Sequence, residues 1–104
     1  MKPFCSLGVL LAMSLLCPAC SRPAATDRDN RRVLEEILTA ITLSNARLLE
    51  DSDNRAKERY AAHQLTDEEY KSMEAIINKA RGGDWGAAES DAYVFRKEHP
   101  FVQR

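Results

Sequence analysis

The stretch "TDEEYKSMEAIINKARGGDWGAAESDAYVFRKEHP" (Thr66–Pro100) decides the fold, because it predicts two helices joined by a short turn. Thr66 followed by Glu69 is the capping-box pattern that begins a helix. Gly82 and Gly83 supply the left-handed conformation that commonly ends one. Between these signals, apolar side chains recur at helical spacing, at Tyr70, Met73, Ile76, Ile77 and Ala80.

A second helix is predicted directly after the two glycines. Asp84 stands where a capping residue is needed, and Pro100 ends the segment because the residue before a proline disfavours helix. One side of this helix carries Trp85, Ala88, Ala92 and Phe95. Since the connection is so short, we expect the two helices to be antiparallel neighbours, forming a C-terminal helical hairpin.

This hairpin resembles a single unit of a tetratricopeptide repeat. Gly83–Trp85 matches the Gly-Asp-aromatic turn of that repeat, Ala88 its small position, and Pro100 its closing proline. Phe95 departs from a position that is usually small, and the Trp-Leu-Gly pattern of the first helix is replaced by Glu69, Ser72 and Met73. Such repeats need about three units to bury a continuous core. We therefore interpret the likeness as convergent hairpin chemistry.

The preceding segment, residues 30–65, also has a helical pattern, which begins at about Asp27. Its apolar stripe consists of Val33, Leu34, Ile37, Leu38, Ile41, Leu48 and Leu49. The polar run Glu50–Arg55 predicts a break, with Ser52 or Asp53 as a cap, although one continuous helix is the alternative. No strand pattern occurs, so the expected fold is all-α, with three or four helices in a small domain over residues 30–104.

The N-terminus has the layout of a signal peptide over residues 1–19. Lys2 precedes an apolar run from Phe4 to Leu16, which at about 13 residues falls short of the roughly 20 that a spanning helix needs. All three cysteines (Cys5, Cys17 and Cys20) lie at or before the expected cleavage point. The remaining chain of about 85 residues therefore cannot form an internal disulfide.

The segment "LCPAC" (Leu16–Cys20) resembles the lipobox of bacterial lipoproteins. Ala19 is the small residue before the modified cysteine, whereas Pro18 and Cys17 depart from the preferred residues. The resemblance implies acylation of Cys20, with palmitate among the chains, and residues 20–29 as anchor and tether. Ser21 matches the pattern of lipoproteins released to the outer membrane, facing the periplasm. Ordinary secretion is the alternative, since Cys17 and Ala19 also suit a general signal peptidase.

Composition and the placement of ionisable residues argue against several functions. The net charge of −1 lacks the basic excess typical of nucleic-acid binders. His63 and His99 have no neighbour at metal-ligand spacing, and we expect surface and helix-end positions for them. The carboxylates fit helix caps and solvated faces. We therefore predict no catalytic residues, no metal and no cofactor, and the chain is not expected to be an enzyme.

Protein binding is the function that remains. Trp85, Tyr93 and Phe101 are the candidate partner-binding residues, because aromatic side chains anchor interfaces. Phe101 is expected to fold back onto the hairpin, with partner docking as the alternative. A chain this short buries a modest core, which a partner or a second copy could extend. The sequence thus predicts an envelope lipoprotein that acts as a non-catalytic accessory factor and binds another envelope protein. The alternative is a soluble periplasmic or secreted binding or inhibitor protein.

Overall fold

Four helices make up the part of the chain, residues 23–101, that the computed structural model describes. They are α2 (Ala24–Thr42), α3 (Ala46–Ala61), α4 (Asp67–Arg81) and α5 (Trp85–Glu98). No strand occurs between Pro23 and Phe101, so the expected all-α class is confirmed. The predicted signal peptide and the lipobox cysteine Cys20 lie outside the described residues.

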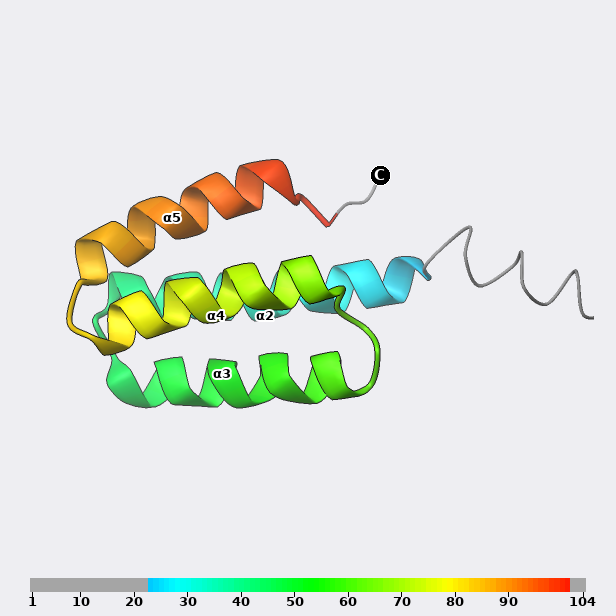
Figure 1. The fold of residues 1–104 in the computed structure, drawn as a ribbon, viewed down its shortest axis with the longest axis horizontal. Coiled ribbons are helices and arrows are strands. Elements are labelled where there is room, and N and C mark those ends of the chain that lie inside the picture. Colours follow the sequence, from blue (N-terminus) through cyan, green and yellow to red (C-terminus); the bar gives the residue numbers. More distant parts are fainter. Residues whose placement is uncertain (1–22, 102–104) are drawn as a thin grey trace, which may run out of the picture.

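The helices are arranged around the pair α2 and α4. Helix α2 contacts each of the other three, and α4 also contacts both α3 and α5. Helices α3 and α5 do not touch each other, and they lie on opposite sides of the central pair (Figure 1). The chain runs up and down with short connections, and α4 and α5 form the antiparallel hairpin that the sequence predicted.

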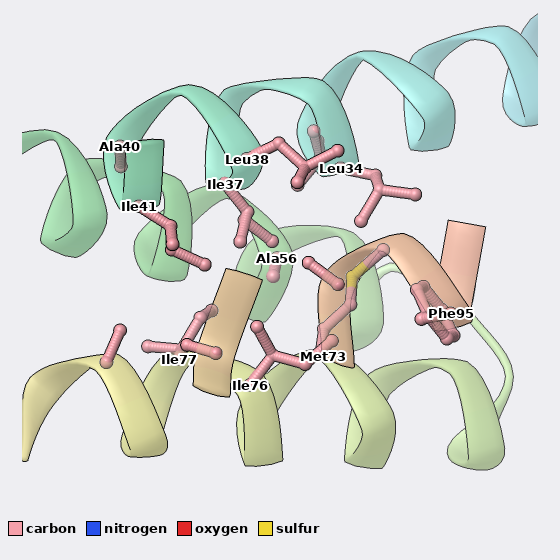
Figure 2. Packing of buried hydrophobic residues seen from close by; sticks show 14 of the residues in the cluster. Leu34, Ile37, Leu38, Ala40, Ile41, Ala56, Met73, Ile76, Ile77 and Phe95 are labelled. Carbon is pink, nitrogen blue, oxygen red and sulfur yellow. The ribbon is translucent and has the colours of Figure 1, made fainter. Parts of the chain in front are cut away.

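The core lies where the apolar faces of these helices meet (Figure 2). Side chains from the predicted faces of α2 and α4 are almost fully buried there: Leu34, Ile37, Ile41, Met73, Ile76 and Ile77. Helix α5 contributes Ala88, Ala92 and Phe95, and the two alanines have no exposed surface, because the backbone of α5 packs closely against its neighbours. Leu48, assigned to the apolar stripe, is instead 37% exposed.

The turn between the first two helices is not where the polar residues predicted it. Helix α3 runs without a break through Glu50–Arg55, so both the expected break and the single long helix are wrong. The chain turns at Leu43–Asn45, where Ser44 has a φ of 50° and the Asn45 side chain accepts a hydrogen bond from the Leu48 N–H (3.0 Å). Asn45 thereby caps α3, whereas Ser52 and Asp53 are buried within it.

Helix α2 begins earlier than the sequence pattern indicated. Residues 24–29, assigned to a tether, are helical, and the buried Asn30 explains why. Its amide donates to the Gln64 carbonyl oxygen (2.9 Å), and its oxygen accepts from Arg59 Nε. The Arg59 guanidinium also donates to the Thr26 carbonyl oxygen (3.3 Å). These contacts hold the first turns of α2 against the end of α3.

The turn of the C-terminal hairpin follows the sequence signals closely. Both hydrogen bonds of the capping box between Thr66 and Glu69 are present at the start of α4. Only the second glycine is left-handed: Gly83 has a φ of 96°, whereas Gly82 has a φ of −78°. The Asp84 side chain then accepts from the Ala87 N–H at 3.3 Å and begins α5.

Gly83 in the turn and Gly86 in the helix that follows it give a matched test of backbone conformation. We expect Gly83→Ala to lower the free energy of unfolding by about 1 kcal/mol, because an L residue is strained at positive φ. Gly86 lies inside α5, and a Cβ atom there would meet nothing within 4 Å. Gly86→Ala should therefore raise stability, by up to about 1 kcal/mol. Urea unfolding of both variants measures the difference; equal effects would contradict this description of the turn.

Candidate functional site

The three candidate partner-binding residues lie in different environments. Phe101 is 6% exposed and packs edge-on against Phe95, with ring centroids 6.1 Å apart. The His99 ring lies 4.6 Å from the same phenylalanine. The expectation that Phe101 folds back onto the hairpin is therefore confirmed. Its ring is buried within the fold and is not free to contact a partner. Trp85 is partly buried against the core.

Tyr93 is the candidate that remains available at the surface. Its side chain is 46% exposed, and the Arg96 guanidinium carbon lies 5.0 Å from its ring centroid. Val94, the next residue, is 54% exposed. Exposed valines are common, so the significance of Val94 depends on the hollow beside it.

A shallow hollow of about 240 Å³, here called the α4–α5 groove, lies between the two helices of the hairpin. Ile76 and Phe95 line it and are nearly buried, whereas Val94 is largely exposed. Ser72 and Ala75 are small, so they leave room along α4, and Asp91 and Glu98 add negative charge. The lining of the groove thus combines apolar side chains from both helices with two acidic residues from α5. Sequence reasoning missed Val94, although an apolar residue outside the predicted buried face of α5 was a visible signal.

The other hollows are richer in charged or polar side chains. One of about 290 Å³ between α2 and α3 contains Leu48 among mostly charged residues, including Arg32, Glu36 and Arg55. A larger one of about 570 Å³ lies at the α3–α4 connection, where His63 is exposed with a φ of 61°. Tyr60 donates there to Asp67 Oδ1 at 2.6 Å. Within residues 23–101, no group of three or more His, Cys, Asp or Glu side chains is placed to hold a metal ion.

An ionic cluster around one buried carboxylate connects α3 and α4. Asp53 is 2% exposed, and its Oδ2 accepts from Lys57 Nζ (2.6 Å) and from an Arg81 nitrogen (2.8 Å). Arg81 also donates to both oxygens of Glu50, at 2.8 and 2.9 Å. Glu74 approaches the same lysine, with its Oε2 4.0 Å from Lys57 Nζ. The cluster therefore ties the middle of α3 to the middle and the end of α4.

The two carboxyl groups of this cluster differ in their pKa values. Burial acts to raise the pKa of Asp53, but its hydrogen bonds with Glu74, Lys57 and Arg81 outweigh that effect and lower it. For Glu74, burial, the hydrogen bond with Asp53 and the charge of that carboxylate together raise the pKa from 4.5 to about 7. At neutral pH Asp53 is therefore ionised, whereas Glu74 is close to the midpoint of its titration.

Comparison with known proteins finds no relative: no family model matches the chain, and no curated protein or solved structure matches it. None of the helices in the described part is long and apolar enough to cross a membrane.

Proposed function

We propose that this chain is a small bacterial envelope lipoprotein whose helical domain binds another protein at the α4–α5 groove. Cys20 is the lipid-anchored residue, and Ser21 directs the protein to the periplasmic face of the outer membrane. The protein acts as a non-catalytic accessory factor, and its partner is another protein of the same envelope.

The observation that carries the binding proposal is the exposed apolar surface beside the groove. Val94 lines the groove and is 54% exposed, whereas Tyr93, the preceding residue, is 46% exposed but does not line it. Helix α5 packs only against α2 and α4, so its outer side has no neighbour among the described helices. A shallow groove between two helices, with apolar side chains in its lining, commonly binds the apolar face of a partner helix. The partner segment that we propose is accordingly an amphipathic helix.

The short distance from the proposed anchor to the fold supports a partner close to the membrane. Helix α2 begins at Ala24, four residues after Cys20. A chain of four residues spans at most about 14 Å, whatever its conformation. The domain would therefore stay beside the bilayer rather than reach across the periplasm.

A soluble periplasmic or secreted protein that binds or inhibits a partner is the second candidate. It is favoured by Cys17 and Pro18, which depart from the lipobox while still permitting ordinary cleavage. The proposed binding surface is the same in both cases, so the two candidates differ only in the chemistry at Cys20.

Site-specific photo-crosslinking in cells tests the binding surface. A photo-reactive amino acid at position 94 is expected to give a discrete crosslinked product with one envelope protein. The same residue at position 58, exposed on α3 away from the groove, should give none. Equal products from both positions, or none from position 94, would contradict the proposal.

A matched pair of substitutions tests whether the groove itself is used. Ala75 is exposed and lines the groove, so Ala75→Trp should fill it. The crosslink at position 94 should then fall at least tenfold, the change expected when about 1.4 kcal/mol or more of binding energy is lost. Ala46→Trp, at an exposed position at the start of α3, should leave the crosslink unchanged. Thermal unfolding of both variants checks that neither has lost the fold.

A further inference from the structure

Two buried carboxyl oxygens in the α3–α4 cluster have no donor. Asp53 Oδ1 and Glu74 Oε2 are both inaccessible to solvent and lack a hydrogen-bond partner when neither carboxyl carries a proton. The other Asp53 oxygen already accepts from Lys57 and Arg81. Glu74 Oε2 lies 4.0 Å from Lys57 Nζ, which is within ion-pair range but too far for a hydrogen bond.

The carboxyl groups of Asp53 and Glu74 also interact with each other. Asp53 and Glu74 interact directly through their side chains, and both converge on the Lys57 ammonium, at 2.6 and 4.0 Å. Two ionised carboxylates side by side in a buried site repel each other, and each would leave an acceptor unsatisfied. A single proton between them removes the repulsion and satisfies both oxygens with one hydrogen bond.

We propose that Asp53 and Glu74 share one proton that clamps α4 to α3, and that loss of this proton as the pH rises to neutrality and above loosens the contact between the two helices. Glu74 donates to Asp53 in the closed state. The ionisable groups that face the pair are Glu50 and Lys57 from α3, and Tyr70 and Arg81 from α4. The proposal concerns the helical domain itself and does not depend on the lipid anchor or the partner.

The direction of the pH effect follows from proton linkage. The pKa of Glu74 is raised to about 7 in the folded chain, from 4.5. Between these values the folded state holds a proton that the unfolded state has lost, so stability falls as pH rises through this window. The lowered pKa of Asp53 acts in a separate window, because its contribution is lost only as pH falls below its ordinary value of 3.8.

The carboxyl titration of Glu74, followed by carbon-13 NMR on the purified protein, tests the shared proton directly. We expect a midpoint near 7, which Asp53→Asn should move toward 4.5 by removing the neighbouring charge. A wild-type midpoint within about one unit of 4.5 overturns the proposal. A raised midpoint that stays in place in a folded Asp53→Asn variant also overturns it.

Unfolding in urea at several pH values tests the clamp and does not depend on the Asp53 variant. For one proton, the folding equilibrium constant of the wild type should fall by up to tenfold per pH unit between about pH 5 and about pH 7. Glu74→Gln keeps a donor toward Asp53 but cannot ionise, so it should lose this dependence. Glu68→Gln, at an exposed position of the same helix, should retain it. A Glu74→Gln variant with the wild-type pH dependence overturns the clamp.

Discussion

Replacing Arg81 with methionine is expected to lower the free energy of unfolding by about 3 kcal/mol, because it leaves the buried Asp53 carboxylate without its cation from α4. Methionine retains much of the aliphatic packing but donates no hydrogen bond. Lys57 still donates to Asp53, which places the expected loss at the lower end of the range for breaking a buried ion pair. The two hydrogen bonds that Arg81 makes to the exposed Glu50 add little, since surface pairs are weak.

A surface ion pair provides the matched control for this prediction. Arg96 on α5 pairs with Glu35 on α2 at 3.3 Å, and both side chains are nearly half exposed. Arg96→Met should therefore change the free energy of unfolding by less than about 1 kcal/mol. Chemical denaturation of both variants at neutral pH measures the contrast. Similar losses from the two variants would show that burial of Asp53 does not determine the strength of the Arg81 contact.

The hairpin could be predicted because its signals are local. The Thr66 capping box, the glycine turn and the Asp84 cap each act within a few residues, and all are present in the structure. Helical periodicity likewise identified the buried faces of α2 and α4, because burial follows the helical repeat wherever a helix packs on one side.

The position of the first turn could not be predicted, since it depends on a distant partner. Asp53 has a turn-forming side chain by local criteria, but Arg81, 28 residues away in the chain, pairs with it inside a continuous helix. The early start of α2 has a similar cause, because Arg59 and Gln64 satisfy the buried Asn30. Neither pairing can be recognised from the local sequence pattern.

The binding surface was only partly predictable for the same reason. Aromatic content pointed to Tyr93, which is exposed, but also to Phe101, which covers the hairpin. Val94 and the groove depend on how closely α5 approaches α4, and that distance is set by small residues on facing sides of the two helices.

Removal of the Cys20 thiol should have the largest effect of all, since it eliminates the proposed anchor. Each methylene group buried in the bilayer contributes about 0.8 kcal/mol, so two or more acyl chains would hold the protein stably on the membrane. Cys20→Ser should therefore move the protein from the membrane fraction to the soluble fraction, without altering the helical fold that begins at Ala24. A folded variant that still partitions with membranes would show that another feature anchors the chain.

The measurement that tests the account most directly is the intact mass of the protein extracted from membranes, for the wild type and for Cys20→Ser. The account predicts a wild-type mass that corresponds to a chain beginning at Cys20 with acyl chains attached, and the absence of that species in the variant. An unmodified wild-type chain that begins at Cys20 or later would contradict it, and the protein would then be a free helical binding protein of the periplasm or the medium.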